Sequence, residues 1–329
     1  MVTVVLPYFN AEKTIEQAVQ SIINQTYDKL EILLIDNNST DLGPEICTKI
    51  AKSDNRIQLL NESRQGVVYA ANQGISKAKG AYIARMDADD IAHPERIQIQ
   101  REQFRSDPKL DISATQVAYM SQTSSSAFEH FVAWSNQILS HRDFLFNQFV
   151  ELPFVNPTLM VSRTTYELVG LHRDGNFPED YEWFLRAMYY DCKVAKVNRK
   201  LLDWVDHSHR LTRTDMRYHA DAFFQIKTEY LAKYLLRQNI NSVWIWGAGK
   251  LAIKRSKWLL DYGIAISGYI DIKAGKKVSG AKCVHYETLS RKDQPFILSY
   301  VTNRGRRDDI RSFLDQRGYS EGLNYIIAG

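Results

Sequence analysis

The sequence contains little cysteine. Its three cysteines, Cys47, Cys192 and Cys283, are far apart in a chain of 329 residues. This spacing fits neither a metal-binding pair nor an even set of disulfides, so we expect a reducing, cytoplasmic location. No apolar run approaches the roughly 20 residues that span a bilayer. The start, Met1–Leu6, enters a strand-like run without a basic leader, so any membrane contact is expected to be peripheral.

A strong charge of either sign is also lacking. The formal net charge is +4, with 42 basic and 38 acidic residues. This is too weak to indicate nucleic-acid binding, although it is compatible with an anionic substrate or a phospholipid surface. With 44% hydrophobic and 24% charged residues, the chain can bury the core of one large domain or two ordinary ones.

The first hundred residues alternate strand-like and helix-like runs. Val2–Leu6, Leu30–Ile35 and Ile57–Leu60 are short apolar runs typical of buried strands, and residues 66–78 are expected to form a helix. Asn10 is placed to cap the helix after the first strand. The alternation predicts an α/β fold with an open sheet, whose ligands bind beyond the carboxyl ends of the strands.

Three carboxylates follow the fourth strand-like run, Ala81–Ala84. Asp87, Asp89 and Asp90 lie within four positions, and anions packed so closely need a cation or hydrogen-bond donors. Mg²⁺ or Mn²⁺ prefers carboxylate oxygens, while substrate phosphates complete its coordination shell. The residues alone leave two interpretations open: a metal–diphosphate site, or a solvated acidic turn that caps the helix near Pro94.

Asp36 also lies at a predicted strand end. A carboxylate there can accept hydrogen bonds from a ribose hydroxyl or a base N–H. The alternative is an Asx turn that serves only the backbone.

Five segments follow one another in a characteristic order. They are Val4–Asn10, Ser21–Tyr27, Glu31–Asp41, Asn72–Gly80 and Met86–Asp90. In this order they resemble the family 2 glycosyltransferases of the GT-A fold, and the resemblance covers about residues 1–215. It implies a GT-A-type open mixed sheet flanked by helices, a nucleotide-sugar donor (usually a UDP-sugar) and inversion at the anomeric carbon.

The resemblance also implies roles for individual residues. Asp36 would hold the base, Asp87 the ribose, and Asp89 a Mn²⁺ or Mg²⁺ ion that bridges the diphosphate. The other residues expected to line the nucleotide pocket are Tyr8, Asn10 and Arg64.

A second acidic segment is Phe177–Arg186. Acids in the first turn of a helix are stabilised by its dipole, so a simple helix start is one interpretation. Inverting transfer, however, needs a base on the face opposite the leaving group, and a carboxylate can serve. The segment resembles the family's Glu-Asp motif, which implies Asp180 as the base, with Glu179 and Trp183 near the acceptor.

The segment Leu201–Arg213 resembles the part that closes the family's catalytic domain, where a histidine and basic residues meet the diphosphate. His207 matches that histidine and is expected to touch the metal. The sequence departs from the family at Val205 and Arg210, where arginine and serine are common. Arg210 or Arg213 is therefore expected to supply positive charge to the bound nucleotide.

The strand–turn–helix pattern restarts after a long helix expected over residues 215–239. Ser242–Ala252 contains a G-x-G-x-x-A turn, and Asp271 follows the next strand, a pattern that fits dinucleotide binding. It resembles the Rossmann-like domains of bacterial polysaccharide-biosynthesis proteins. Roughly 90 residues are too few for a full dinucleotide fold, which favours a structural, acceptor-binding or oligomerisation role. The predicted domains are a GT-A domain over 1–215, a helical connector over 216–239 and a small Rossmann-like α/β domain over 240–329.

Three functions follow from these patterns. The leading one is a metal-dependent inverting glycosyltransferase that moves a sugar to a hydroxyl of a glycan or lipid-linked acceptor in surface-polysaccharide biosynthesis. The alternatives are an NAD(P)-linked oxidoreductase and a catalytically inactive nucleotide-sugar-binding scaffold. The expected partners are the donor and the acceptor and not nucleic acid, while peripheral membrane association and a homo-oligomer stay open. The presence of both Asp89 and Asp180 favours the enzyme.

Overall fold

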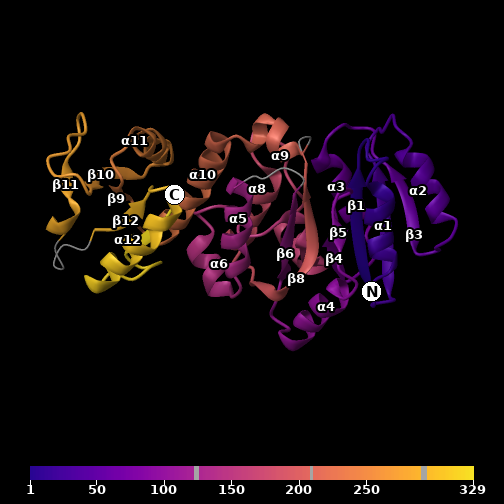
Figure 1. Ribbon diagram of the computed structural model, residues 1–329. Helices are drawn as coiled ribbons and strands as arrows, with labels where there is room; N and C mark the ends of the chain where they lie inside the picture. The colour runs from indigo at the N-terminus through magenta and orange to yellow at the C-terminus, as the bar shows by residue number, and fades with distance from the viewer. Residues whose placement is uncertain (122–125, 208–209, 290–294) are drawn as a thin grey trace. The chain divides into compact units, whose positions relative to one another are not determined.

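The computed structural model describes the chain except for residues 122–125, 208–209 and 290–294 (Figure 1). Contacts divide the chain into two compact units. The first comprises Met1–Phe144 and Pro153–Asp215, and the second comprises Leu145–Leu152 and Met216–Gly329. Residues 145–152, which lie within the predicted GT-A domain, are thus grouped with the second unit.

An eight-stranded mixed sheet forms the centre of the first unit, in the order β3-β2-β1-β4-β7-β6-β8-β5. Neighbouring strands are parallel from β3 to β4, and β7 runs antiparallel to β4 and β6. This arrangement confirms the predicted open mixed sheet. The strands are β1 (Val2–Tyr8), β2 (Leu30–Asp36), β3 (Ile57–Asn61), β4 (Tyr82–Arg85), β5 (Ile91–Ala92), β6 (Ile112–Ser121), β7 (Met160–Ser162) and β8 (Val194–Asp206).

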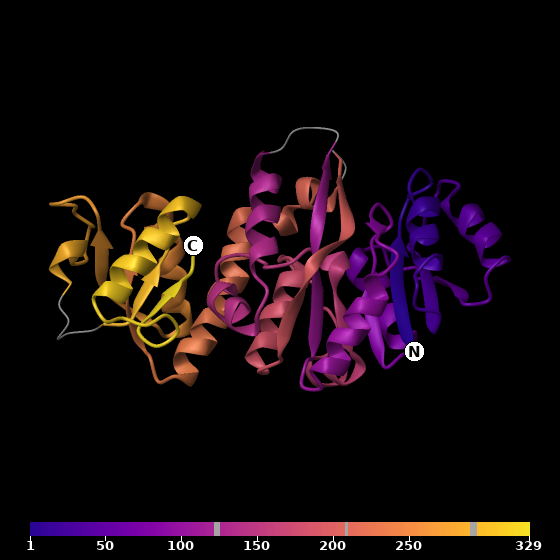
Figure 2. The same cartoon turned by 60° about the horizontal axis from the view of Figure 1, so that its bottom comes forward.

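Helices cover both faces of the parallel part of this sheet (Figure 2). Successive strand residues point to opposite faces. Val4 and Leu6 therefore pack in the same cluster as the buried face of α1, whereas Val5 packs with that of α3. The helices that begin in this unit are α1 (Ile15–Ile23), α2 (Gly43–Ala51), α3 (Val67–Lys77), α4 (Arg96–Ser106), α5 (Ser126–Gln137), α6 (His141–Asn147), α7 (Arg163–Val169), α8 (Glu179–Tyr189) and α9 (Leu211–Thr214).

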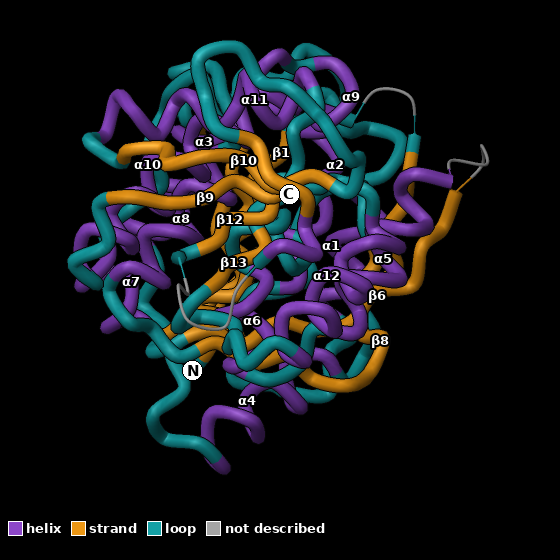
Figure 3. Tube along the Cα trace, turned by 90° about the vertical axis from the view of Figure 1, so that its left-hand side faces the viewer, coloured by secondary structure: helices purple, strands orange, loops and turns teal. Residues whose placement is uncertain are grey.

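The second unit contains a parallel five-stranded sheet in the order β11-β10-β9-β12-β13 (Figure 3). The chain moves outward from β9 to one side and then returns to β12 on its other side, so the strand order reverses beside β9. The strands are β9 (Ser242–Trp246), β10 (Ala265–Asp271), β11 (Cys283–His285), β12 (Ile297–Ser299) and β13 (Tyr325–Ile327). The helices are α10 (Ala220–Arg237), α11 (Lys250–Ser256) and α12 (Arg304–Gln316).

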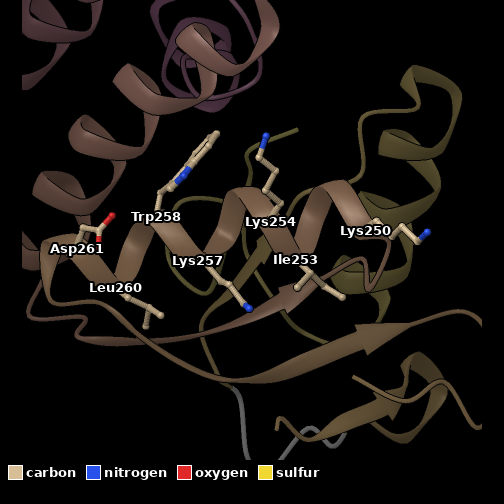
Figure 4. Close-up of a pocket in the computed structure, with 7 residues that line it drawn as sticks. All are labelled: Lys250, Ile253, Lys254, Lys257, Trp258, Leu260 and Asp261. Atoms are coloured by element: carbon tan, nitrogen blue, oxygen red, sulfur yellow. The ribbon is translucent and has the colours of Figure 1, made fainter. Parts of the chain in front are cut away.

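Helix α11 continues into a 3-10 helix over Lys257–Tyr262, and one side of this stretch lines a shallow groove (Figure 4). Its lining residues are Lys250, Ile253, Lys254, Lys257, Trp258, Leu260 and Asp261. The Nζ of Lys254 lies 2.7 Å from Asp221 Oδ2. Because acids accompany the lysines, the groove has only a small excess of positive charge.

In the part of the chain that the structure describes, no helix combines the length and the hydrophobicity that crossing a bilayer requires.

Candidate active site

The parallel strands β1, β2 and β4 end at one edge of the sheet, and three of the predicted features, Tyr8, Asp36 and the acidic turn, lie there. Tyr8 and Asp36 are the last residues of β1 and β2, and they are paired in register. Strand β4 ends at Arg85, and the N–H of Met86 donates to the carbonyl of Val5 (3.0 Å). The acidic turn therefore starts beside β1, at the edge where open α/β sheets bind ligands.

The loops after β1 and β2 hold each other through side chains. Asp36 Oδ1 accepts the N–H of Ser39 (3.1 Å), which forms an Asx-type turn. Asn10 has a φ of 47°, and its Oδ1 accepts the N–H of Thr40 (2.8 Å). The prediction that Asn10 caps α1 is wrong, because its side chain bonds the neighbouring loop and the residue at the start of α1 is Thr14.

Asn37 is a buried residue at this edge whose role sequence reasoning missed. Its Nδ2 donates to the carbonyls of Glu62 (2.9 Å) and Arg64 (2.8 Å), and its Oδ1 accepts the N–H of Gly66 (2.8 Å). Both amide donors and the acceptor are thus used. The side chain fixes the loop after β3 against the end of β2, and no local sequence signal identifies these distant partners.

Arg64 and Tyr8, both predicted in the nucleotide pocket, differ in exposure. The Arg64 side chain is 67% exposed, its Nε lies 3.1 Å from Glu62 Oε1, and its guanidinium lies 4.7 Å from the centre of the Tyr69 ring. Tyr8 is buried, and this burial together with the neighbouring Cys47 thiol raises the pKa of the Tyr8 phenol. The phenol is therefore protonated at physiological pH.

The acidic turn brings three carboxylates together. Asp87, Asp89 and Asp90 each offer an oxygen, and these oxygens lie within 4.8 Å of one another. Asp87 Oδ1 lies 2.9 Å from Arg85 Nη2, and Asp89 Oδ2 lies 2.7 Å from His207 Nε2. Like charges at such separations repel, so this turn needs compensating positive charge.

Arg210 supplies part of that charge. Its Nη1 lies 3.3 Å from Asp90 Oδ1 and 3.6 Å from Asp89 Oδ2. The buried guanidinium also donates to the carbonyl of Val205 and lies 4.8 Å from the ring centre of Trp204. Arg210 was predicted to supply positive charge to the nucleotide, and this role stays a prediction; in the structure Arg210 contacts the acidic turn.

The two carboxylates beside Arg210 have different environments. Asp90 is fully buried, and although its Oδ1 accepts the N–H of Val205 (2.9 Å), its Oδ2 has no hydrogen-bond partner among the residues that the structure describes. Burial raises the pKa of Asp90 well above its usual value, against the opposing effect of Arg210. Burial also acts to raise the pKa of Asp89, but the His207 hydrogen bond and the Arg210 charge outweigh it and lower that pKa. An ionised carboxylate beside an unpartnered buried oxygen fits a hard divalent cation.

Arg213 forms an ion pair with a different carboxylate, Asp206. Its Nη2 is 2.6 Å from Asp206 Oδ2, and its guanidinium is 4.7 Å from the ring centre of Phe128. Asp206 also accepts the hydroxyl of Tyr119 (2.7 Å). Arg213 was expected to supply positive charge to the bound nucleotide, and that role stays a prediction.

Asp180 is the second residue of α8, which begins at Glu179. Its side chain is half-buried, and burial, followed by the charges of Glu179 and Asp87, raises the pKa of Asp180 to about 8. A carboxyl group with this pKa is suited to accept a proton near neutral pH.

Trp183, predicted near the acceptor, is fully buried. Its Nε1 donates to the carbonyl of Gly170 (2.8 Å), and its ring packs against Tyr166 and His172 at centroid distances of 5.0 and 5.5 Å. With no exposed surface, Trp183 supports α8 from its core side and does not face an acceptor. Glu179 is also buried, at 5% exposure.

Arg85 is a buried cation at this edge that sequence reasoning did not single out. One of its nitrogens pairs with Asp87, while none of the residues outside the three undescribed segments offers a hydrogen bond to Nε or Nη1. Burial, with a smaller effect of Arg85, lowers the pKa of His172 to about 3. His172 is therefore neutral at physiological pH.

The chain is similar to known proteins both in sequence and in fold. It is 27% identical over 248 residues, 73% of this chain and 76% of the relative, to an uncharacterized glycosyltransferase of Haemophilus influenzae. The structure of S. aureus TarS residues 1–349 in complex with UDP matches with a TM-score of 0.56 at 13% identity, covering 79% of this chain and 70% of that chain. The mannosyltransferase PcManGT from Pyrobaculum calidifontis, in complex with GDP-Man and Mn²⁺, matches with a TM-score of 0.50 at 16% identity, covering 79% and 68%.

The family to which the chain belongs follows from its sequence, because the two solved structures are too distant to show more than the fold. The model of "Glycosyl transferase family 2" matches residues 3–170, about half of the chain. The matched region contains β1 to β4 and the acidic turn. The chain therefore belongs to glycosyl transferase family 2, and it is an enzyme of the glycosyltransferase class.

Proposed function

We propose that the protein is a metal-dependent inverting glycosyltransferase that uses a nucleotide-sugar donor, with a UDP-sugar as the first candidate. The observation that carries the proposal is the cluster of three carboxylates, Asp87, Asp89 and Asp90, after β4. The charge of Asp87 also contributes to the raised pKa of Asp180 at the start of α8. Inverting transfer needs a site for the leaving diphosphate and a base on the opposite face of the sugar.

The nucleoside is proposed to lie at the ends of β1 and β2. Asp36 would accept hydrogen bonds from the base and Asp87 from the ribose, with Tyr8, Asn10 and Arg64 around them. Two features support this placement: Tyr8 and Asp36 are adjacent in register, and Arg64 is exposed beside the same loops. TarS, which shares the fold, binds UDP and UDP-GlcNAc.

A divalent cation is proposed at the acidic turn. Asp89 would be a ligand, with His207 beside it, because His207 Nε2 already lies on the Asp89 carboxylate. Mg²⁺ or Mn²⁺ bound there would neutralise the negative charge of the departing diphosphate. Arg210 would hold Asp89 and Asp90 in place before the ion binds, and we propose that Arg210, more than Arg213, provides the fixed positive charge near the nucleotide.

Asp180 is proposed as the general base that takes the proton from the acceptor hydroxyl. Its raised pKa means that its ionised form gains basicity, at the cost of a smaller ionised fraction at pH 7. Glu179 would act on the acceptor side mainly through its charge on Asp180, since it is buried.

The acceptor is proposed to be a hydroxyl of a glycan or a lipid-linked saccharide in surface-polysaccharide biosynthesis. The family assignment supports a saccharide acceptor in general terms. A cytoplasmic location, with peripheral contact to the membrane where a lipid-linked acceptor would lie, belongs to the same proposal, and so does self-association of the chain.

The proposal is tested by a donor screen. The purified protein is incubated with UDP-, GDP- and dTDP-sugars, with and without Mn²⁺, and its thermal stability and the release of nucleoside diphosphate are measured. The expected result is metal-dependent stabilisation and slow hydrolysis with one UDP-sugar. Absence of stabilisation by all of the nucleotides, in a protein that melts cooperatively, would overturn the proposal.

A further inference from the structure

Helix α3 links the proposed nucleotide pocket to the segment that carries the base. The helix begins after Gly66, whose N–H is held by Asn37 next to Asp36. Near its other end, a Cβ added at Gly74 would lie 2.5 Å from Val5 and 2.8 Å from Ile35. Such close approach of helix and strands means that α3 is fixed on the sheet and cannot shift without disturbing packed side chains.

The side of α3 that faces away from this contact bonds the segment before α8. Asn72 Nδ2 donates to the carbonyl of His172 (2.8 Å), and Asn72 Oδ1 accepts the N–H of the same residue (3.0 Å). One turn earlier, the hydroxyl of Tyr69 donates to Asp174 Oδ2 (2.7 Å). Residues three apart lie on one side of a helix, so both contacts come from a single face.

His172 also contacts the start of α8. Its Nδ1 lies 3.5 Å from the carbonyl of Glu179, the residue before Asp180, and its ring packs against Trp183. Trp183 in turn bonds the carbonyl of Gly170. Residues 170, 172, 179 and 183 therefore contact one another, and the two hydrogen bonds of Asn72 join this segment to α3.

We propose that Asn72, assisted by Tyr69, is a positioning residue that sets the place of the Asp180 carboxylate relative to the donor; this rests on the proposed function of Asp180. Two hydrogen bonds to one backbone residue fix both its distance and its orientation. A base acts only within hydrogen-bond reach of the proton that it takes, and a displacement of about 1 Å can cost on the order of 100-fold in rate.

The test compares Asn72→Ala with Gln73→Ala. Gln73 is the next residue of α3, but its Nε2 donates to the carbonyl of Asn61 (2.8 Å) and not to the segment before α8. With the UDP-sugar of highest hydrolysis rate, we expect kcat of Asn72→Ala to fall about 10- to 100-fold, while donor KM and the Kd for UDP stay within about twofold. Tyr69→Phe should show a smaller loss of kcat, and Gln73→Ala should resemble the wild type.

Hydrogen exchange provides a readout that needs no activity. In Asn72→Ala, amides of residues 170–180 should exchange faster, while those of 57–66 stay unchanged. A kcat within about twofold of the wild type, or parallel losses of kcat and UDP affinity, would overturn the positioning role. Absence of UDP-sugar turnover in the wild type would count against the proposed function, while the exchange result would still decide whether Asn72 holds this segment.

Discussion

Each unit of the protein has aspartates at or just after the end of a parallel strand, but the hydrogen-bond partners of these aspartates differ between the two units. In the second unit, Asp271 is the last residue of β10, and its Oδ2 accepts the N–H of Ala248 while its Oδ1 accepts the N–H of Lys273, both at 2.9 Å. In the first unit, one oxygen of Asp90 has no hydrogen-bond partner within the described part of the chain, and Asp89 contacts the ionisable side chains of His207 and Arg210.

The comparison shows when an acid at a strand end indicates a ligand. Asp271 has the position expected of a ribose-binding acid, yet both of its oxygens are occupied by nearby backbone. This supports a structural role for the glycine turn of the second unit over dinucleotide binding. The acidic turn of the first unit concentrates charge that its own backbone does not satisfy, which is the condition that favours binding a cation.

The largest expected effect concerns the base. Asp180→Asn removes the proton acceptor while keeping the shape of the side chain, so turnover of the donor should fall about 100- to 10,000-fold. Affinity for UDP, measured by calorimetry, should stay within about twofold. Asp203→Asn, a change of the same kind on β8, should have wild-type turnover; near-normal activity of Asp180→Asn would remove Asp180 from the mechanism.

The pH profile sharpens the same assignment. Because burial raises the pKa of Asp180 to about 8 and the base must be ionised, kcat/KM should rise about tenfold per pH unit below this value and level off above it. The folded-state pKa lies above the unfolded value of about 4, so ionising Asp180 costs folding free energy as the pH rises between these values. Asp180→Asn should therefore melt higher than the wild type at pH 8 and equally at pH 4. A profile that is flat from pH 6 to 9 would contradict this.

The cation site is tested by Asp89→Asn. Loss of one anionic ligand should lower UDP affinity in the presence of Mn²⁺ at least about tenfold, to the value measured without metal. Calorimetric titration with and without Mn²⁺ provides both numbers. Equal affinity in the mutant and the wild type under both conditions would show that Asp89 is not a ligand.

Arg210→Met tests whether the acidic turn depends on its buried arginine. Removing one partner of a buried ion pair leaves uncompensated charge, so the free energy of unfolding should fall by about 3 kcal/mol. Added Mn²⁺ should recover more stability in this variant than in the wild type, as denaturant titrations can measure. Arg199→Met, which removes an exposed pair with Glu95, should change stability by less than about 1 kcal/mol.

The smallest effect is expected in the second unit. Asp271→Asn weakens two hydrogen bonds of the turn and should cost about 1 kcal/mol of stability, with donor turnover unchanged. Tryptophan fluorescence should not respond to NADH in either form. If NADH quenched the fluorescence of the wild type saturably and did not quench that of Asp271→Asn, Asp271 would be a dinucleotide ligand and its structural role would be wrong.

Local sequence was a good guide to the elements and to the acidic turn. Apolar runs predicted β1 and β2 to within two residues, because buried parallel strands need continuous hydrophobic stretches. It was a poor guide to side-chain environment. Trp183 lies three residues after Asp180 and was placed with it at the acceptor, but it is a core residue, because which side of α8 is covered depends on α7 and the segment after it.

The sequence by itself determined the family, the alternation of strands and helices in the first hundred residues and the presence of three carboxylates after β4, because these depend on neighbouring residues and on a motif of fixed spacing. Only the tertiary structure decided that Arg210 lies between Asp89 and Asp90, that Asn37 joins two loops and that Asn72 holds His172. Such contacts join residues about 25 to 120 positions apart, and charge and hydrogen bonding act through space and not along the chain.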